Sequence, residues 1–221
     1  MNSYTQRSFT PEEALAQGAI SAGVRLVASY PGSPGIGVMS ALIEHASTKE
    51  KAELYIEWPV NERVALEMGI GASMAGGRSL ICVKSVGMNV LLDPLMTFNL
   101  TGVHGGLVIL LGDDPGAYGS QNEQDARLLV HLVEIPLLEP SSAAEGYAMM
   151  RTAFELSERF KTAIILRITR SFTQQNGTFL PNKKSTDAHT RYLGLVREPY
   201  RFVPYPGNAV EMHREQHRRL A

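Results

Sequence analysis

The chain has 221 residues, 44% of them apolar, and a formal net charge of −1 at pH 7. This length fits one domain of ordinary size with a tail, and the apolar content supports a buried core and excludes wholesale disorder. The balanced charge offers no basic surface for nucleic acid, and the strongest apolar run, 107–111, is far too short to span a bilayer.

The chain holds one cysteine, Cys82, in an apolar run, which indicates an inert side chain in the core. One cysteine cannot form an internal disulfide or a CxxC metal site in this chain, and a reducing compartment is the simplest interpretation. The first residues lack the apolar core of a signal peptide. We therefore expect a cytoplasmic protein that binds neither nucleic acid nor membrane.

Helix signals begin after a loose leader at 1–9. Thr10 and Glu13 form a capping box that starts a helix, and Gly23 ends it. A second capping box, Ser142 with Glu145, starts a helix that runs to about residue 160. Further helices are predicted at 36–46, 61–75 and 91–100.

Short apolar runs alternate with these helices and are predicted as strands: 26–28, 54–56, 80–83, 107–111, 137–138 and 163–166. The runs show no polar alternation, which is typical of strands that are covered on both faces. The sequence therefore predicts an α/β fold, with an open, mostly parallel, doubly wound sheet of about six strands and helices on both faces.

The character of the chain changes beyond this alternation. We expect the α/β domain to occupy 10–172 and the segment 173–221 to be a linker and tail toward a missing domain or partner. The stretch 174–190 is polar and broken, and 211–220 is charged and helical in pattern.

One candidate for chemistry is Glu62, which follows a predicted strand and falls in the first turn of a helix. In a parallel sheet this places it at the carboxyl ends of the strands, where ligands bind. A carboxylate at a helix start is also favoured by the helix dipole, and Glu57 and Glu67 lie nearby. Position alone does not select Glu62.

Two loops at the same edge are further candidates. The glycine-rich segment 31–37 lies between a strand and a helix, as a phosphate loop would, but it equally fits a tight turn against a ligand or partner. The polar segment 112–125 follows the most apolar strand. Its paired Asp113 and Asp114 are compatible with magnesium or with simple turns, and we favour a substrate-facing loop without a metal site.

Five blocks in order, spread over about 10–170, carry a family resemblance: 30–34, 57–67, 84–90, 93–97, and 113–116 with 120–125. Together they resemble the N-terminal domain of the alpha subunit in the indolepyruvate:ferredoxin oxidoreductase family. The resemblance implies the thiamine-diphosphate-binding fold, with this chain as its pyrimidine-binding domain. The implied reaction is oxidative decarboxylation of a 2-oxoacid, most simply an arylpyruvate, to an acyl-coenzyme A.

The resemblance also implies roles for individual residues. Glu62 matches the catalytic glutamate, whose carboxyl group bonds the aminopyrimidine ring nitrogen and favours the imino tautomer that removes the thiazolium proton. The segment Pro31, Gly32 and Ser33 matches a loop that lines the cofactor, with Ser33 also toward the substrate. The residues matching a second cofactor-facing loop are Val86, Gly87 and Asn89.

The implied substrate residues are Ser120, Gln121 and Asn122. Ser85 departs from the family pattern, because a histidine is expected there in arylpyruvate enzymes, and this departure leaves the 2-oxoacid open.

The chain lacks the Gly-Asp-Gly motif that holds magnesium and the diphosphate, and it lacks a CxxC cluster motif. The resemblance therefore implies that thiamine diphosphate is shared with a partner, a diphosphate-binding domain or subunit that brings the magnesium. A ferredoxin-like subunit would bring the iron–sulfur clusters, and coenzyme A and the 2-oxoacid would bind in a dimer or larger assembly. No metal ligand is expected on this chain.

Two alternatives remain at this point. One is a subunit of a two-chain thiamine diphosphate decarboxylase of the sulfopyruvate type, which needs no clusters. The other is a non-catalytic homologue that binds a partner, against which the intact Glu62 argues only weakly.

Overall fold

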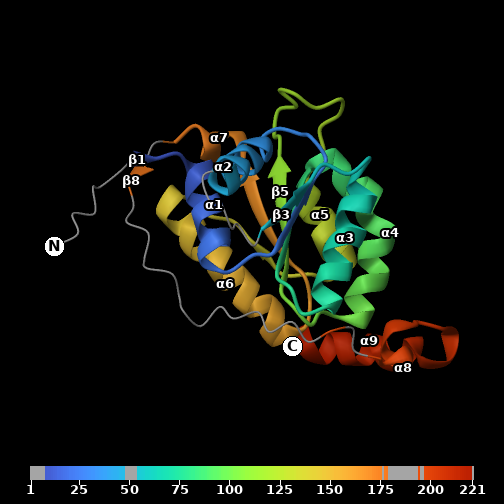
Figure 1. Cartoon of the computed structure of the whole chain (residues 1–221). Coiled ribbons are helices and arrows are strands. Elements are labelled where there is room, and N and C mark those ends of the chain that lie inside the picture. The colour runs from blue at the N-terminus through green and yellow to red at the C-terminus, as the bar shows by residue number, and fades with distance from the viewer. Residues whose placement is uncertain (1–7, 48–53, 176, 179–193, 195–196, 221) are drawn as a thin grey trace.

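A computed structural model of the chain describes residues 8–47, 54–175, 177–178, 194 and 197–220 (Figure 1). Its central sheet has six strands, all parallel, in the order β3-β2-β4-β5-β7-β6. The strands are β2 (Leu26–Ser29), β3 (Tyr55–Glu57), β4 (Ser79–Lys84), β5 (Leu107–Asp113), β6 (Leu137–Leu138) and β7 (Ile164–Thr169). The predicted open parallel sheet is confirmed, and each predicted strand overlaps one of these.

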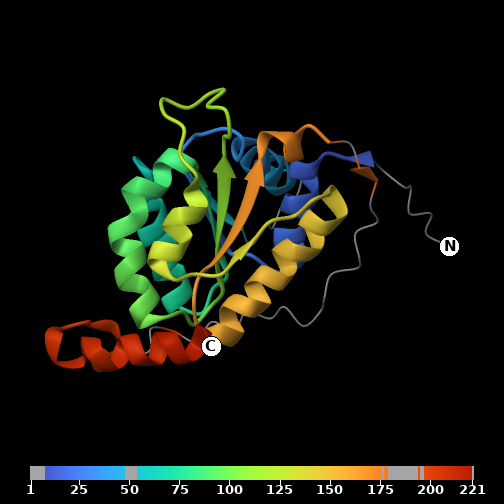
Figure 2. The ribbon, with the colours of Figure 1, turned by 180° about the vertical axis from the view of Figure 1, so that it is seen from behind.

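Helices cover both faces of the sheet (Figures 1 and 2). One face carries α1 (Pro11–Ser21), α2 (Ile36–Ser47) and α6 (Ala143–Phe160). The other face carries α3 (Glu62–Met74), α4 (Ser85–Thr101) and α5 (Ala126–Val133). Both predicted capping boxes lie at helix starts, with Glu13 N–H donating to Thr10 and Glu145 N–H donating to Ser142.

Successive strand residues enter two separate cores. In β4, Leu80 and Cys82 pack with α1, α2 and α6, whereas Ile81 and Val83 pack with α3, α4 and α5. Both faces of the sheet are therefore buried, which explains why the strand sequences are unbroken apolar runs and do not alternate between apolar and polar residues.

Helix α4 begins six residues earlier than the sequence predicts. We expected 86–89 to be a loop, and this expectation is wrong, because Ser85 already starts the helix. Met88, Leu91 and Leu95 are buried at the helical spacing of three and four, so the apolar stripe that packs on α3 and the sheet starts well before residue 91. Helix α5 was also missed; Asp125 caps it by accepting from the Arg127 N–H.

The tail contains α8 (Pro199–Phe202) and α9 (Pro206–Leu220). Helix α9 lies across the amino-terminal end of the sheet against α4 (Figure 1). There the Arg219 guanidinium donates to the carbonyls of Lys161 and Asn99, at 2.6 and 3.1 Å. The described part of the expected linker thus packs on the domain itself.

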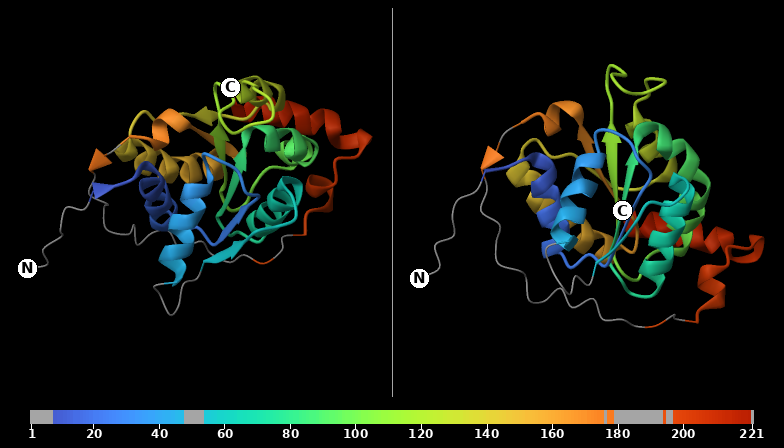
Figure 3. Two further views of the ribbon diagram at one scale, coloured as in Figure 1. Left: turned by 90° about the horizontal axis from the view of Figure 1, so that it is seen from above. Right: turned by 45° about the horizontal axis from the view of Figure 1, so that its top comes forward.

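Two short strands, β1 (Ser8–Phe9) and β8 (Gly177–Thr178), form a separate antiparallel pair. It joins the end of the expected leader to the start of the tail, beside the short helix α7 (Arg170–Thr173), as Figure 3 shows from above. The rest of the leader, 1–7, and most of 174–190 lie outside the described residues. Among the described residues, no helix combines the length and apolar character needed to cross a membrane.

The strand order predicts a ligand-binding crevice at the carboxyl edge of the sheet, and we call this edge the rim. The chain leaves β2 toward the β3 edge and leaves β4 toward β5, so connections depart in opposite directions from two neighbouring strands. A parallel sheet opens a ligand-binding crevice at such a reversal. The loops that follow β2 and β4 are therefore the ones to examine.

Candidate active site

The loops at the rim pack tightly on one another through glycines. A Cβ at Gly32 would lie 2.8 Å from the Cβ of Lys84, the last residue of β4. A Cβ at Gly112 would lie 2.9 Å from the Cδ of Pro34 and from the Gly35 nitrogen. The loop after β2 is thus seated on the ends of β4 and β5, which confirms that these loops share one edge.

Glu62 is the first residue of α3 and is half-buried at this edge. The helix is started by Asn61, whose side chain accepts the Val64 N–H at 2.9 Å. Because Asn61 performs the capping, the Glu62 side chain is not used for it. Within the described part of the chain, the Glu62 carboxylate makes no hydrogen bond or ion pair.

Gly87, in the first turn of α4, faces this carboxylate. A Cβ at Gly87 would lie 2.6 Å from Glu62 Oε1 and 2.7 Å from its Cγ, closer than two such atoms can approach. A larger residue at this position would therefore force the Glu62 side chain to shift. Gly87 was expected at the cofactor, and the structure places it directly against Glu62.

The neighbouring carboxylates are engaged elsewhere. Glu57 accepts the Tyr55 hydroxyl at 2.7 Å and the Trp58 N–H at 3.2 Å. Glu67 pairs with Arg63 at 2.9 Å, one helical turn away. Of the three carboxylates that position alone could not rank, Glu62 is the one without a partner among the described residues.

The first turns of α4 are held by Gln124, a residue to which sequence reasoning gave no role. Its amide donates to the Ser85 carbonyl at 2.8 Å, and the Asn89 amide donates back to Gln124 at 2.9 Å. Asn89 is exposed and Val86 is partly buried. The polar side chain of Asn89 therefore serves first to fasten α4 to the loop after β5. The only sequence signal for Gln124 was its place in the matched block 120–125.

In the loop after β2, Pro31 and Ser33 are exposed at the rim, and Gly32 is partly buried. The Ser33–Pro34 peptide bond is cis. The Gly32 carbonyl accepts the Ile36 N–H at 3.1 Å, which closes the turn at the start of α2. This loop lies next to the end of β4, from which α4 departs, so it borders the same crevice as Glu62.

The loop after β5 projects above the sheet (Figure 1) and is organised by Asp114. Asp114 accepts the Gly119 N–H and the Ser120 hydroxyl, both at 2.8 Å. Chiefly the Gly119 N–H, and also Ser120, lower the pKa of Asp114. Ser120 thus supports the loop, whereas Gln121 and Asn122 are exposed on it.

The companion aspartate, Asp113, points into the protein. It pairs with Arg167 of β7 at 2.8 Å, and both side chains are almost fully buried. Among the described residues, no cluster of three or more histidine, cysteine, aspartate or glutamate side chains could hold a metal ion. Asp114 therefore organises the loop after β5, whereas Asp113 forms a buried ion pair with β7.

Glu62 is thus a half-buried carboxylate at the carboxyl edge of a parallel sheet, without a partner among the described residues. Residues 17–193 match the family described as pyruvate flavodoxin/ferredoxin oxidoreductase, thiamine diphosphate-binding. The match covers most of the chain, and the chain belongs to this family.

Its relatives are named as one subunit of an indolepyruvate oxidoreductase, IorA. The chain is 40% identical to that of Archaeoglobus fulgidus over 198 residues, which are 89% of this chain and 32% of the relative. It is 38% identical to that of Methanothermobacter marburgensis over 204 residues, which are 92% of this chain and 32% of the relative. It is 36% identical to that of Thermococcus kodakarensis over 203 residues, which are 90% of this chain and 31% of the relative. The chain thus spans about a third of the length of the curated relatives it matches.

Among solved structures, the fold is similar to the 2-oxoglutarate:ferredoxin oxidoreductase of Magnetococcus marinus, determined with 2-oxoglutarate, coenzyme A and succinyl-coenzyme A bound. The TM-score is 0.77 at 15% identity, over 97% of this chain and 44% of that one. This likeness confirms the predicted thiamine-diphosphate fold.

Proposed function

We propose that this chain is the pyrimidine-binding part of a thiamine-diphosphate-dependent 2-oxoacid:ferredoxin oxidoreductase that acts on an arylpyruvate. The observation that carries the proposal is the Glu62 carboxylate, which lies against Gly87 and has no partner among the described residues. Membership of the thiamine diphosphate-binding family and the IorA names of the relatives support the same conclusion.

The residues at the crevice fit the ring of this cofactor. A half-buried carboxyl group without a partner leaves a hydrogen-bonding requirement that a ring nitrogen satisfies. The close approach of Gly87 fixes the position of that carboxyl group from one side. Gly32 and Ser33 border the rim from the β2 side, and among the described residues no group of histidine, cysteine, aspartate or glutamate side chains could hold the magnesium of a diphosphate.

In this proposal the Glu62 carboxyl group would hold the aminopyrimidine ring through its ring nitrogen and would carry the proton of that hydrogen bond. Thiamine diphosphate, when bound, supplies a thiazolium carbon that becomes the nucleophile toward the ketone of the 2-oxoacid. Gln124 and Asn89 maintain the position of α4, so that Gly87 keeps the Glu62 side chain aimed at the crevice. The loop carrying Gln121 and Asn122 covers the substrate side.

A second domain or subunit completes the site. It would hold the diphosphate through magnesium, and a ferredoxin-like subunit would carry the iron–sulfur clusters that receive the electrons. The coverage of only about a third of each relative supports a larger polypeptide or assembly around this domain. Coenzyme A would accept the acyl group in that assembly.

The test uses the complex captured from its native cells with a tagged copy of this chain. Reduction of a low-potential dye is measured with indolepyruvate and coenzyme A, for the wild type, Glu62→Gln and Glu67→Gln. We expect Glu62→Gln to lose at least about 100-fold in turnover, the lower range for a positioned acid–base group, with assembly unchanged. Glu67→Gln, on the same helix but paired with Arg63, should keep full activity.

Other outcomes identify the alternatives. Aldehyde release that needs no electron acceptor would contradict the oxidoreductase function and indicate a two-chain decarboxylase of the sulfopyruvate type. Unchanged turnover in Glu62→Gln would contradict a cofactor role for this chain and indicate a homologue that only binds a partner.

A further inference from the structure

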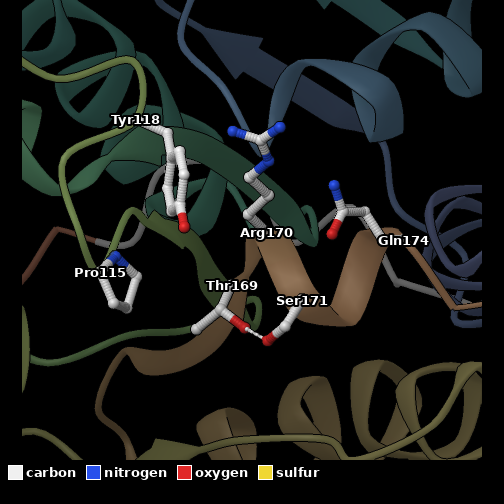
Figure 4. Close-up of a pocket in the computed structure, with 6 residues that line it drawn as sticks. All are labelled: Pro115, Tyr118, Thr169, Arg170, Ser171 and Gln174. Carbon is white, nitrogen blue, oxygen red and sulfur yellow. Dashed lines mark hydrogen bonds between the residues drawn. The ribbon is translucent and has the colours of Figure 1, made fainter.

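A pocket of about 320 Å³ lies at the rim, and it is lined in part by the segment 112–125, which the sequence predicts to face the substrate. The loop after β5 contributes Pro115 and Tyr118 (Figure 4). The end of β7 and the following turn contribute Thr169, Arg170, Ser171 and Gln174.

The lining is rich in hydrogen-bond donors and contains no acidic side chain. The Arg170 guanidinium and the Gln174 amide carry N–H donors. The hydroxyls of Thr169 and Ser171 lie 2.9 Å apart, so one of them donates to the other and the second keeps a hydrogen for a ligand. Such a lining favours a ligand that carries negative charge.

Arg170 is oriented but not neutralised. Its guanidinium carbon lies 4.5 Å from the centre of the Tyr118 ring, a cation–π distance, and Figure 4 shows the two side chains next to each other. Within the described residues it pairs with no carboxylate. Arg167, three residues earlier, contrasts with it by pairing with both Asp113 and Glu139.

The pocket shares an edge with Glu62. Lys84 at the end of β4 is level with Gly112 of β5, and Asp113 is level with Thr169 of β7. Two strand spacings, about 10 Å, therefore separate the pocket from the strand that leads into Gly87. The pocket and Glu62 therefore lie on the same edge of the sheet.

We propose that this pocket is an anion subsite, in which Arg170, stacked on Tyr118, binds the carboxylate or phosphate group of a substrate. The proposal rests on the function proposed above, which offers two sources of such a group: the carboxylate of the 2-oxoacid and the phosphates of coenzyme A. A planar guanidinium suits both.

The first test measures binding to the full 221-residue chain by titration calorimetry. The probes are inorganic phosphate, adenosine 3′,5′-bisphosphate as the nucleotide end of coenzyme A, and phenylpyruvate. We expect saturable binding of at least one probe, weakened about tenfold or more in Arg170→Gln, as expected for a lost charged hydrogen bond. Arg170→Lys should retain part of the affinity.

The matched control is Arg159→Gln. Arg159 is also exposed and stacks on an aromatic ring, that of Phe160 at 5.2 Å, but it lies at the far end of the sheet. The Arg159→Gln variant should bind all three probes with the affinity of the wild type. Absence of saturable binding to the wild type, or equal affinities in Arg170→Gln and the wild type, would overturn the proposal.

The second test separates the sources in the captured complex. Arg170→Gln should raise the KM for coenzyme A if the pocket holds a phosphate, or the KM for the 2-oxoacid if it holds the carboxylate. If neither KM changes while Glu62→Gln abolishes turnover, the subsite is wrong and the proposed function stands. If Arg170-dependent binding persists in a complex without oxidoreductase activity, the function is wrong and the anion site stands.

Discussion

The Glu62 side chain and the Gly87 backbone occupy adjoining space at the rim, so that a single Cβ on Gly87 would fall 2.6 Å from Glu62 Oε1. Each residue lies in the first turn of a helix at the carboxyl edge of the sheet, Glu62 in α3 and Gly87 in α4. The position of the carboxylate is therefore set by how closely these two helices approach.

Gly87→Ala tests this relationship. The added methyl group would push the Glu62 carboxyl group away, and a displacement of about 1 Å costs on the order of 100-fold in turnover. Stability should change little, because the atoms that must move belong to a flexible side chain. Turnover and assembly of the captured complex are measured together.

Gly71→Ala is the control for Gly87→Ala. Gly71 is exposed in α3, and a Cβ there would meet no atom within 4 Å. This variant should keep full activity and gain about 0.5–1 kcal/mol of stability, as alanine does over glycine in a helix. Equal activities of the two variants would contradict the role given to Gly87.

Arg167→Met should destabilise the domain by about 3–5 kcal/mol, because it leaves Asp113 as a buried charge without its partner. Urea unfolding of the chain measures the loss. In Arg127→Met an exposed pair with Asp125 is removed, and the loss should stay below about 1 kcal/mol. Similar losses in both variants would show that burial of the Asp113 pair has no special effect.

Glu158 gives stability a predicted pH dependence. Burial works to raise its pKa, but a two-point pairing with Arg78 at 2.7 Å and the Gly106 N–H outweigh burial, and the pKa is lowered. A lowered folded-state pKa stabilises the protein above the ordinary carboxyl value of 4.5, and this contribution is lost as the pH falls below it.

Glu158→Gln should therefore cost about 2 kcal/mol of unfolding free energy at pH 7 and progressively less below pH 4.5. Unfolding by urea at a series of pH values measures the difference between variant and wild type. A difference that stays constant down to strongly acidic pH would contradict the pairing.

Cys82 should react with thiol reagents only when the protein unfolds. Its burial in β4 raises the pKa of the thiol to about 12, so almost no thiolate exists at pH 8. Because the chain has one cysteine, absorbance from an aromatic disulfide reagent reports this site alone. We expect slow labelling in buffer and complete, rapid labelling in urea; rapid labelling of the native chain would contradict this burial.

The alternation of apolar runs with capped helices determined the parallel sheet from sequence alone. Both signals are local: a strand buried on both faces needs an unbroken apolar run, and a capping box needs residues three apart. The start of α4 was not predicted, because Val86, Gly87 and Val90 have low helix propensity. In the structure the helix is stabilised there by burial of Met88 and Leu91.

The residue sequence also placed Glu62 at the edge where ligands bind, because it predicts Glu62 in the first turn of the helix that follows a parallel strand. Position did not separate Glu62 from Glu57 and Glu67, and the family resemblance singled it out. Glu57 and Glu67 are engaged by partners two and four residues away, whereas Gly87 of α4 is brought against Glu62 only by the fold. The same holds for Arg170 and Tyr118, more than fifty residues apart in the chain and stacked at the rim. Contacts between distant segments depend on how the sheet and helices pack, and a single sequence carries no local pattern for them.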